Sequence, residues 1–137
     1  MREIFLDINK FTIKSQEALM EAQALALKHN HQQILIEHLL LCLVNQENGL
    51  IPQILKNLNV NIISLTSELE QEINKIPSVY GANQQPALSI ETAKVLNSSR
   101  EIAKQMKDDY VSVEHLVIAV FKELPKHNII KILNKHG

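Results

Sequence analysis

The sequence has 137 residues, of which 45% are hydrophobic and 21% charged, and its net charge is −1. That length fits one domain around one core, and the near-neutral charge excludes a strong electrostatic attraction to nucleic acid or anionic lipid. The lone cysteine, Cys42, excludes an internal disulfide. The longest strictly apolar run, 39–44, is too short to cross a bilayer, and the N-terminus does not read as a leader peptide. We therefore expect a cytoplasmic protein.

The first third of the chain predicts two helices joined by a polar hinge. Thr12 can accept hydrogen bonds from the free amides of a first helical turn, and an apolar stripe with helical spacing follows it. The stripe contains Ala18, Ala22, Leu25 and Ala26. After the hinge, HNHQQ at 29–33, comes IEHLLLCLV at 36–44, which is apolar nearly all round after its first turn. Such a helix is expected to be central and buried.

Two shorter helices and a loop are expected next. Gly49 ends the buried helix, and Pro52 suits the first turn of a third helix. Residues 62–76 predict a fourth. The segment PSVYGANQQPA at 77–87 combines proline, glycine and asparagine, which predicts an exposed loop.

The second half of the chain repeats the first at an offset of 77 residues. Residues 11–46 then pair with 88–123 without a gap; 6 of the 36 pairs are identical and 14 are apolar in both copies. Ser89 takes the capping position, KDD at 107–109 replaces the hinge, and VEHLVIAVF at 113–121 repeats the buried helix. The repeated stripe contains Val95, Ser99, Ile102, Ala103 and Met106. Ser112 is a good N-cap for the second buried helix, whereas Leu35 is a poor one for the first.

A looser match after a small shift pairs ILKNLN at 54–59 with IIKILN at 129–134, so a further helix is expected at about 128–135. We predict an all-α fold, a pseudo-twofold bundle of seven or eight helices built from two tandem four-helix repeats. The single domain, 1–137, divides into repeat one at about 11–76, a linker loop at 77–87 and repeat two at about 88–137. The chain stops part-way through the second copy, which suggests a boundary inside a longer protein.

The two Glu-His pairs, Glu37-His38 and Glu114-His115, allow two interpretations. A carboxylate in the first turn of a helix meets free amides and the positive end of the helix dipole, which is worth about 0.3–1 kcal/mol, so capping is the simpler one. Alternatively, one or both glutamates face a groove and hold a cationic or amide group of a ligand. The histidines are expected to be core side chains that donate to a carbonyl, in preference to ligands or bases.

A zinc site is a further alternative, because His38 and Cys42 are four residues apart on one helix and His29 and His31 lie nearby. The second copy argues against it. The corresponding residues there are Met106, Asp108, His115 and Ala119. The chain has no P-loop, nucleophile elbow, HExxH or CxxC motif. No enzymatic activity, cofactor or metal is therefore expected, and a small metal-dependent enzyme that uses the three histidines is kept as an alternative.

These segments together resemble a known family. FTIKSQEALMEAQALALKHNHQQILIEHLLLCLVNQENG at 11–49 resembles the first repeat of the N-terminal domain of Clp-type unfoldase chaperones. LSIETAKVLNSSREIAKQMKDDYVSVEHLVIAVFKE at 88–123 is similar to the second repeat. NKIPSVYG at 74–81 looks like the ClpB disaggregase branch, where Leu-Pro-x-Val-x-Gly is usual.

The resemblance implies a substrate-capturing domain of a hexameric AAA+ ATPase. ATP and Mg would bind in ATPase modules that this chain does not contain, so it would have no activity alone. The family's polar substrate-binding positions correspond to Thr12, Asp108 and Glu114, although the family often has glycine where Lys107 stands. An apolar groove is also implied. The candidates for it are Leu96, Ile102, Tyr110 and Val113.

One departure keeps a second branch open. His115 stands where ClpB relatives often carry leucine, whereas ClpC relatives carry histidine there and glutamate at both repeat positions. The resemblance therefore also allows a ClpC-type domain in which Glu37 and Glu114 receive a phosphoarginine tag or an adaptor. The expected partners are unfolded or aggregated polypeptides, the AAA+ modules of the parent and a co-chaperone, with no nucleic acid and no membrane. The isolated domain is expected to be monomeric.

Overall fold

The computed structural model describes residues 8–80 and 85–136, and it confirms the all-α prediction. The elements of the described residues are η1 (Ile8–Lys10), α1 (Ile13–Lys28), β1 (Gln33–Ile34), α2 (Ile36–Val44), α3 (Leu50–Asn57), α4 (Ile62–Asn74), β2 (Ala87–Leu88), α5 (Ile90–Gln105), α6 (Val113–Glu123) and α7 (Asn128–Lys135). Residues 81–84 of the predicted loop lie outside this description. The two short strands carry too few residues for an alternating pattern, and the sequence did not indicate them.

Two short backbone pairings join the halves of the chain. β1 pairs in parallel with β2, so that Ile34 lies opposite Leu88. Phe11 forms a parallel bridge with Val111. The two pairings are equivalent under the offset of 77 residues that aligns the copies, because Ile34 then corresponds to Val111 and Leu88 to Phe11. Each copy therefore contributes the segment before its first helix to one pairing and the segment before its second helix to the other.

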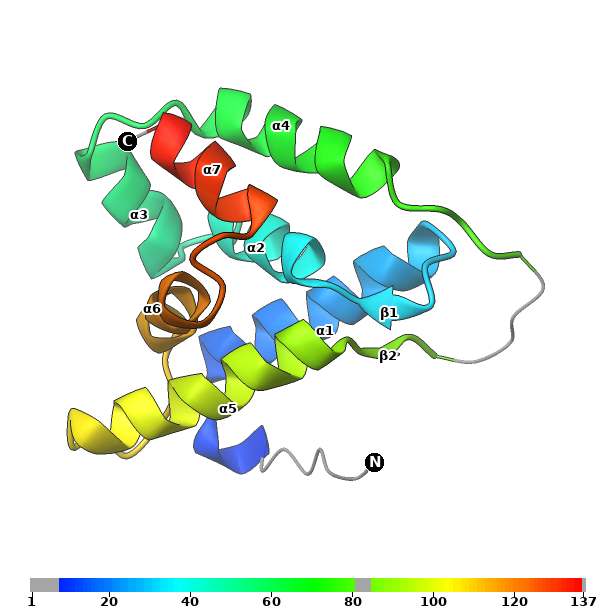
Figure 1. The fold of residues 1–137 in the computed structure, drawn as a ribbon. Helices are drawn as coiled ribbons and strands as arrows, with labels where there is room; N and C mark the ends of the chain where they lie inside the picture. Colours follow the sequence, from blue (N-terminus) through cyan, green and yellow to red (C-terminus); the bar gives the residue numbers. More distant parts are fainter. Residues whose placement is uncertain (1–7, 81–84, 137) are drawn as a thin grey trace.

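Helices α2 and α6 form the centre of the bundle. In Figure 1, α4 and α7 lie on one side of α2, with α1 and α5 on the other. The largest fully buried side chains include Leu39 and Leu43 of α2 and Leu116 of α6. The amides of the outer helices α1 and α5 are capped as predicted, because Thr12 accepts from the amide of Ser15 and Ser89 accepts from that of Thr92.

In each central helix, the side chain of a histidine at the third helical position takes part in the N-terminal cap. Nδ1 of His38 accepts a hydrogen bond from the backbone amide of Leu35 at 2.9 Å, and Nδ1 of His115 accepts one from the amide of Ser112, also at 2.9 Å. The rings thus occupy the third helical position and satisfy a donor outside the first turn. Burial of both histidines was predicted correctly. Their donation to a carbonyl was not, because the second ring nitrogen of each meets another side chain.

That second partner differs between the copies. Nε2 of His115 lies 2.8 Å from a carboxylate oxygen of Asp108. Nε2 of His38 lies 2.9 Å from Nδ1 of His31, which stands 77 residues before Asp108. Because the Leu35 amide occupies Nδ1 of His38, its Nε2 carries the hydrogen and donates it to His31. His31 in turn hydrogen-bonds the backbone of Ile76, two residues beyond the end of α4.

The turn after each outer helix uses a left-handed residue. Asn30 follows α1 with φ of 58°, and Lys107 follows α5 with φ of 61°. Asparagine tolerates this region well, whereas a lysine carries a Cβ that crowds the following carbonyl. The second turn is therefore the more strained of the two.

Replacing Lys107 by glycine should relieve that strain. We expect Lys107→Gly to raise the free energy of unfolding by about 0.5–1 kcal/mol, since the steric cost removed exceeds the extra entropy of the unfolded glycine. Urea unfolding followed by circular dichroism measures it. The matched control is Lys94→Gly inside α5, which should lower the same quantity by about 1 kcal/mol. A loss of stability in both variants would contradict the strain argument.

The His31–His38 pair should make the fold sensitive to acid. Burial, followed by the charges of His31 and His29, lowers the pKa of His38 from 6.5 to about 4. The unfolded chain therefore binds a proton in this range that the folded chain does not. The free energy of unfolding should be level above pH 6.5 and fall by up to about 3 kcal/mol as the pH drops towards 4.

The matched variant for this test is His38→Gln, which keeps a side-chain acceptor for the Leu35 amide but cannot titrate. Urea unfolding from pH 7.5 to 4.5 should show a shallower fall for the variant than for the unmodified protein. Equal slopes would show that other groups cause the acid sensitivity.

Candidate binding site

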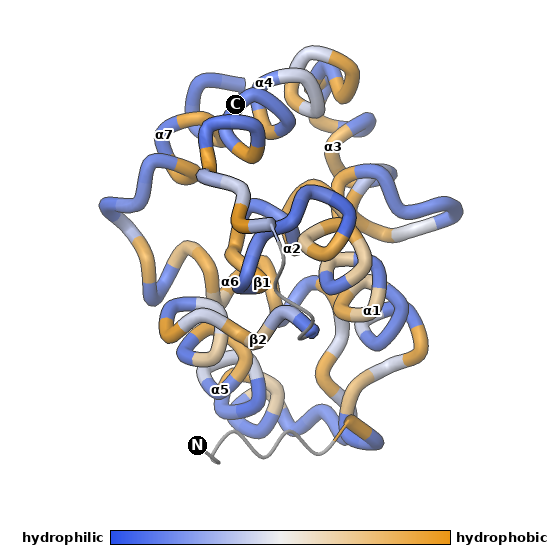
Figure 2. The backbone as a smooth tube through the Cα atoms, turned by 90° about the vertical axis from the view of Figure 1, so that its right-hand side faces the viewer, coloured by the Kyte–Doolittle hydropathy of each residue, from blue (hydrophilic) through white to orange (hydrophobic). Residues whose placement is uncertain are grey.

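An apolar groove opens between α3, α4, α6 and α7. It has a volume of about 310 Å³, and its floor is made of side chains that also belong to the core. Its lining residues are Leu40, Val44, Ile51, Ile54, Leu55, Leu58, Val60, Leu65, Glu114, Val117, Ile118, Phe121, Leu133, Asn134 and His136. The hydropathy colouring of Figure 2 shows apolar segments on both α3 and α6. The groove thus offers a binding partner an almost wholly apolar surface.

The rim of the groove is accessible to a ligand. Leu58, which directly follows α3, is 63% exposed, and Ile118 and Phe121 of α6 are 43% and 41% exposed. Large apolar side chains that stay this exposed in one cluster mark an interaction surface more often than isolated ones do. Glu114, in the first turn of α6, places an exposed carboxylate beside them.

Polar contacts hold the wall of the groove that α7 forms. His136 lies 2.7 Å from Glu68 of α4, and Asn128 donates to Glu72 at 2.7 Å. The hydrogen bond from His136 lowers the pKa of the Glu68 carboxyl. These contacts fix the two ends of α7 on α4, so α7 keeps its place while the face towards α6 stays open.

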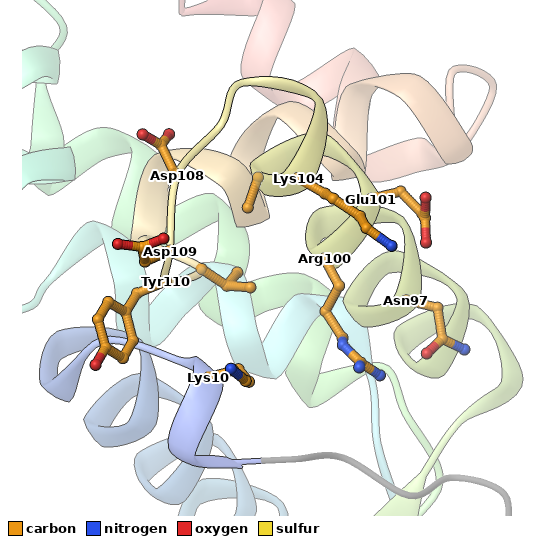
Figure 3. A pocket seen from close by; sticks show the side chains of 10 residues that line it. Lys10, Asn97, Arg100, Glu101, Lys104, Asp108, Asp109 and Tyr110 are labelled. Carbon is orange, nitrogen blue, oxygen red and sulfur yellow. The ribbon is translucent and has the colours of Figure 1, made fainter.

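A second hollow, of about 470 Å³, is polar and charged. It lies between α5, the residue that ends η1 and the turn from α5 to α6. Figure 3 shows Asp109 and Tyr110 on one side of it and Asn97 and Arg100 on the other. Lys10 and Lys104 bring further cations, whereas Asp108 and Glu101 bring anions. The mixed charges cancel, so the hollow has little preference for either sign.

The predicted polar positions lie at different places around these two surfaces. Asp108 lines the polar hollow, and Thr12 adjoins it, since its amide donates to the carbonyl of Val111 at 2.9 Å. Glu114 instead lines the apolar groove. Glu37, its counterpart in the first copy, is half-buried in the first turn of α2 and lines neither surface. The carboxylates of Glu37 and Glu114 have no ion-pair or hydrogen-bond partner within the described parts of the chain.

The predicted apolar positions lie outside the apolar groove. Leu96, Ile102 and Val113 are at most 7% exposed and belong to the core between α5 and α6. None of the three lines the apolar groove or the polar hollow. Tyr110 is 55% exposed but lines the polar hollow. Core and groove positions share the same apolar helical spacing, so the sequence alone does not distinguish them, and a role of these four residues in substrate binding stays a prediction.

Several of the groove residues that the sequence missed come from two short helices. One signal in the sequence points to them, the similarity of 54–59 to 129–134. Those segments belong to α3 and α7, which stand on two sides of the groove. The similarity indicates a repeated helix, but it does not show where the two helices lie relative to α6 or which of their residues stay exposed.

The zinc alternative lacks a site among the described residues, where no three His, Cys, Asp or Glu side chains could hold one metal ion. His31 and His38 bond each other, and burial raises the pKa of the Cys42 thiol to about 12. Both the amide and the hydroxyl of Ser112 lie within 3.0 Å of Nδ1 of His115, so the contact between these two residues is that of a helix cap. Across residues 8–80 and 85–136, no helix has the length and apolarity needed to cross a bilayer.

Comparison with known proteins agrees with this fold. The Clp repeat (R) N-terminal domain family matches residues 10–136. Chaperone protein ClpB of Clostridium tetani is 39% identical over 133 residues, which cover 95% of this chain and 15% of the relative. ClpB of Rickettsia typhi is 38% identical over 135 residues, which cover 96% of this chain and 15% of the relative. The chain thus spans about 15% of the length of these curated relatives.

Solved structures share the fold at lower sequence identity. The Hsp104 N-terminal domain of Candida albicans superposes with a TM-score of 0.81 and 22% identity, covering 93% of this chain and 82% of that one. A ClpV N-domain in complex with a VipB peptide has a TM-score of 0.74 and 16% identity, covering 95% of this chain and 81% of that one. With a family match over almost its whole length and ClpB relatives near 38% identity, the chain belongs to the Clp repeat N-terminal domains, of the kind found in ClpB chaperones.

Proposed function

We propose that this domain captures exposed apolar segments of unfolded or aggregated polypeptides in the groove between α3, α4, α6 and α7. The observation that carries the proposal is the groove itself, with an apolar floor and a rim of large, partly exposed apolar side chains. Closing it with an apolar segment removes that surface from water, at about 25 cal/mol for each Å² buried. The groove has few polar groups to fix a particular side chain, so it suits many sequences.

Glu114 would add a polar preference to this apolar surface. Its carboxylate lies on the rim and is exposed. A client segment that carries lysine, arginine or an amide next to its apolar residues would place that group against the carboxylate. Thr12 and Asp108 would act further along, at the polar hollow. A client that continues beyond the groove would meet them there.

The domain would be one part of a longer protein. The ClpB relatives are several times longer than this chain, which covers about 15% of them. We propose that the parent protein hydrolyses ATP in AAA+ modules, assembles as a hexamer and works with a co-chaperone. Capture by one domain would be weak, because an unfolded segment loses conformational entropy when it binds. Six domains in one assembly would raise the avidity.

One structural relative supports peptide capture by this fold. The solved ClpV N-domain holds a VipB peptide, and it shares the fold of this chain at a TM-score of 0.74. The fold can therefore present a peptide-binding surface. We extend this to the present chain as a proposal, and the groove is the surface best suited to it.

A second candidate function rests on the paired glutamates. Glu37 and Glu114 occupy the same position of the twofold-related helices α2 and α6. Each could receive the guanidinium group of a phosphoarginine tag, or a basic residue of a folded adaptor. This ClpC-type reading uses both glutamates equally, whereas capture in the groove uses Glu114 alone.

Amide-shift NMR titration with a permanently unfolded polypeptide tests the groove directly. Shifts should gather on α3, α6 and α7. The double variant Ile54→Ser with Ile118→Ser should bind at least tenfold more weakly, because each isoleucine contributes about 1 kcal/mol when it is covered. Ile63→Ser is the matched control. Ile63 is 83% exposed on α4 and lies outside the groove, so that variant should bind normally.

Other patterns of shifts would point elsewhere. Glu114→Ala should weaken binding of the unfolded chain by a few-fold, and Glu37→Ala should leave it unchanged. If phosphoarginine shifts the first turns of α2 and α6 alike while the unfolded chain shifts nothing, the tag-recognition function replaces the groove. Shifts confined to 108–110 would place the client at the polar hollow instead.

A further inference from the structure

The first copy has a helix in the place where the second copy has its apolar groove. Under the offset of 77 residues, Ile118 of α6 corresponds to Leu41 of α2. Ile118 is 43% exposed on the rim of the groove, whereas Leu41 is only 8% exposed. Leu41 lines two hollows together with residues of α4, so α4 lies over that part of α2. The two side chains are alike, and the difference in exposure comes from what covers them.

The two short helices show the same difference. Ile54 of α3 corresponds to Ile129 of α7 in the match of 54–59 to 129–134. Ile54 is 39% exposed, whereas Ile129 is only 1% exposed. α4 packs against both α2 and α7 (Figure 1). The counterparts of α2 and α7 in the other copy are α6 and α3, which form two sides of the groove. The groove is therefore the surface that an equivalent of α4 would cover.

α4 shows which kind of segment fits such a surface. It is an amphipathic helix of 13 residues, Ile62–Asn74. Its buried residues are Leu65, Leu69 and Ile73, which follow one another at intervals of four and so lie on one face. The other side of the helix carries serine, glutamate and glutamine.

Two hydrogen bonds define the direction of α4 on α2. Near the start of α4, Thr66 donates to the side chain of Asn45, the residue that follows α2. Beyond the end of α4, the backbone of Ile76 meets His31, which also contacts His38 in the first turn of α2. The start of α4 thus lies at the end of α2, and the two helices run antiparallel.

The chemistry of the groove favours a helix over an extended segment. Its lining residues lie in helices or in the turns that follow them, and they are apolar apart from Glu114, Asn134 and His136. An extended segment would bring its backbone amides and carbonyls against apolar side chains, where they lose their hydrogen bonds to water. A helix satisfies these groups internally and presents only side chains to the groove.

The charges at the two ends of α6 fit a helix that runs in the direction of α4. Lys122 stands where the first copy has Asn45, and Glu114 lies in the first turn of α6. Both side chains are exposed, and neither has an ion-pair or hydrogen-bond partner among residues 8–80 and 85–136. A helix antiparallel to α6 would begin beside Lys122 and end beside Glu114. A carboxylate in its first turn and a lysine or arginine in its last turn would match both ends.

We propose that a client segment binds in the groove as an amphipathic helix, in the place and direction that α4 takes in the first copy. This inference rests on the client capture proposed above and adds the conformation and pattern of the client. Apolar residues at intervals of four face the groove, an acidic residue near the start meets Lys122, and a basic residue near the end meets Glu114.

The probe for this proposal is a synthetic peptide with the sequence of α4 and its caps, NIISLTSELEQEINK, residues 61–75. Fluorescence anisotropy gives its affinity for the 137-residue protein, and its Cα chemical shifts should become helical when it binds. Ile54→Ser with Ile118→Ser in the protein should weaken binding at least tenfold. Met20→Ser is the control, because Met20 is 69% exposed on α1 and outside the groove. Circular dichroism confirms that the variants stay folded.

A matched peptide separates the helical mode from capture in general. Ser67→Pro in the peptide keeps its apolar and charged residues but breaks the helix, so it should bind at least tenfold more weakly. If both peptides bind the groove equally, the client is extended and this inference fails, while client capture stands. The same holds if a permanently unfolded polypeptide shifts the groove and the helical peptide does not. If neither shifts it, both proposals fail.

The direction and the occupant have tests of their own. Thr66→Glu in the peptide should tighten binding several-fold, and Lys122→Gln in the protein should remove that gain. An equal gain in both proteins would overturn the antiparallel direction. Sedimentation of the protein alone should show a monomer. A dimer that Ile118→Ser dissolves would make a second copy the occupant of the groove instead.

Discussion

The two crossed backbone pairings fix the geometry of the whole domain. Phe11, before α1, pairs with Val111, before α6, and Leu88, before α5, pairs with Ile34, before α2. Each copy therefore completes the other, and α1 of the first copy packs against both α2 and α6. A two-residue ladder is weak alone. Here it orients helices whose apolar faces then close one core, which supplies most of the stability.

The same frame allowed the two copies to diverge at their surfaces. The position that follows each outer helix is His31 in one copy and Asp108 in the other, and each contacts the capping histidine of its own copy. The contact between His31 and His38 is neutral and buried near the loop between the copies. The contact between His115 and Asp108 leaves the carboxylate of Asp108 at the edge of the polar hollow. The outer face of α1 carries Met20 and Leu27, whereas the corresponding residues of α5 are Asn97 and Lys104.

How far the sequence could predict the structure depended on the range of the interaction. Helix existence and the caps at Thr12 and Ser89 followed from local patterns, and the structure confirms them. The terminal helix matched its expected bounds, Asn128–Lys135. The hydrogen bonds of His38 and His115 did not follow, because they depend on residues seven positions away that only the folded turn brings within 2.9 Å. The strand pairings depend on partners in the other copy.

The candidate site was harder to predict, because the exposure of its residues depends on how far the neighbouring helices α3 and α7 extend over α6. α6 has eleven residues, about 16 Å, whereas α3 and α7 have eight each, about 12 Å. Short helices cannot cover the full length of the apolar face of α6, so Ile118 and Phe121 stay exposed while Leu116 and Val120 are buried. On the sequence all four look alike. The groove is thus a consequence of helix length and placement, and the apolar pattern of α6 alone does not reveal it.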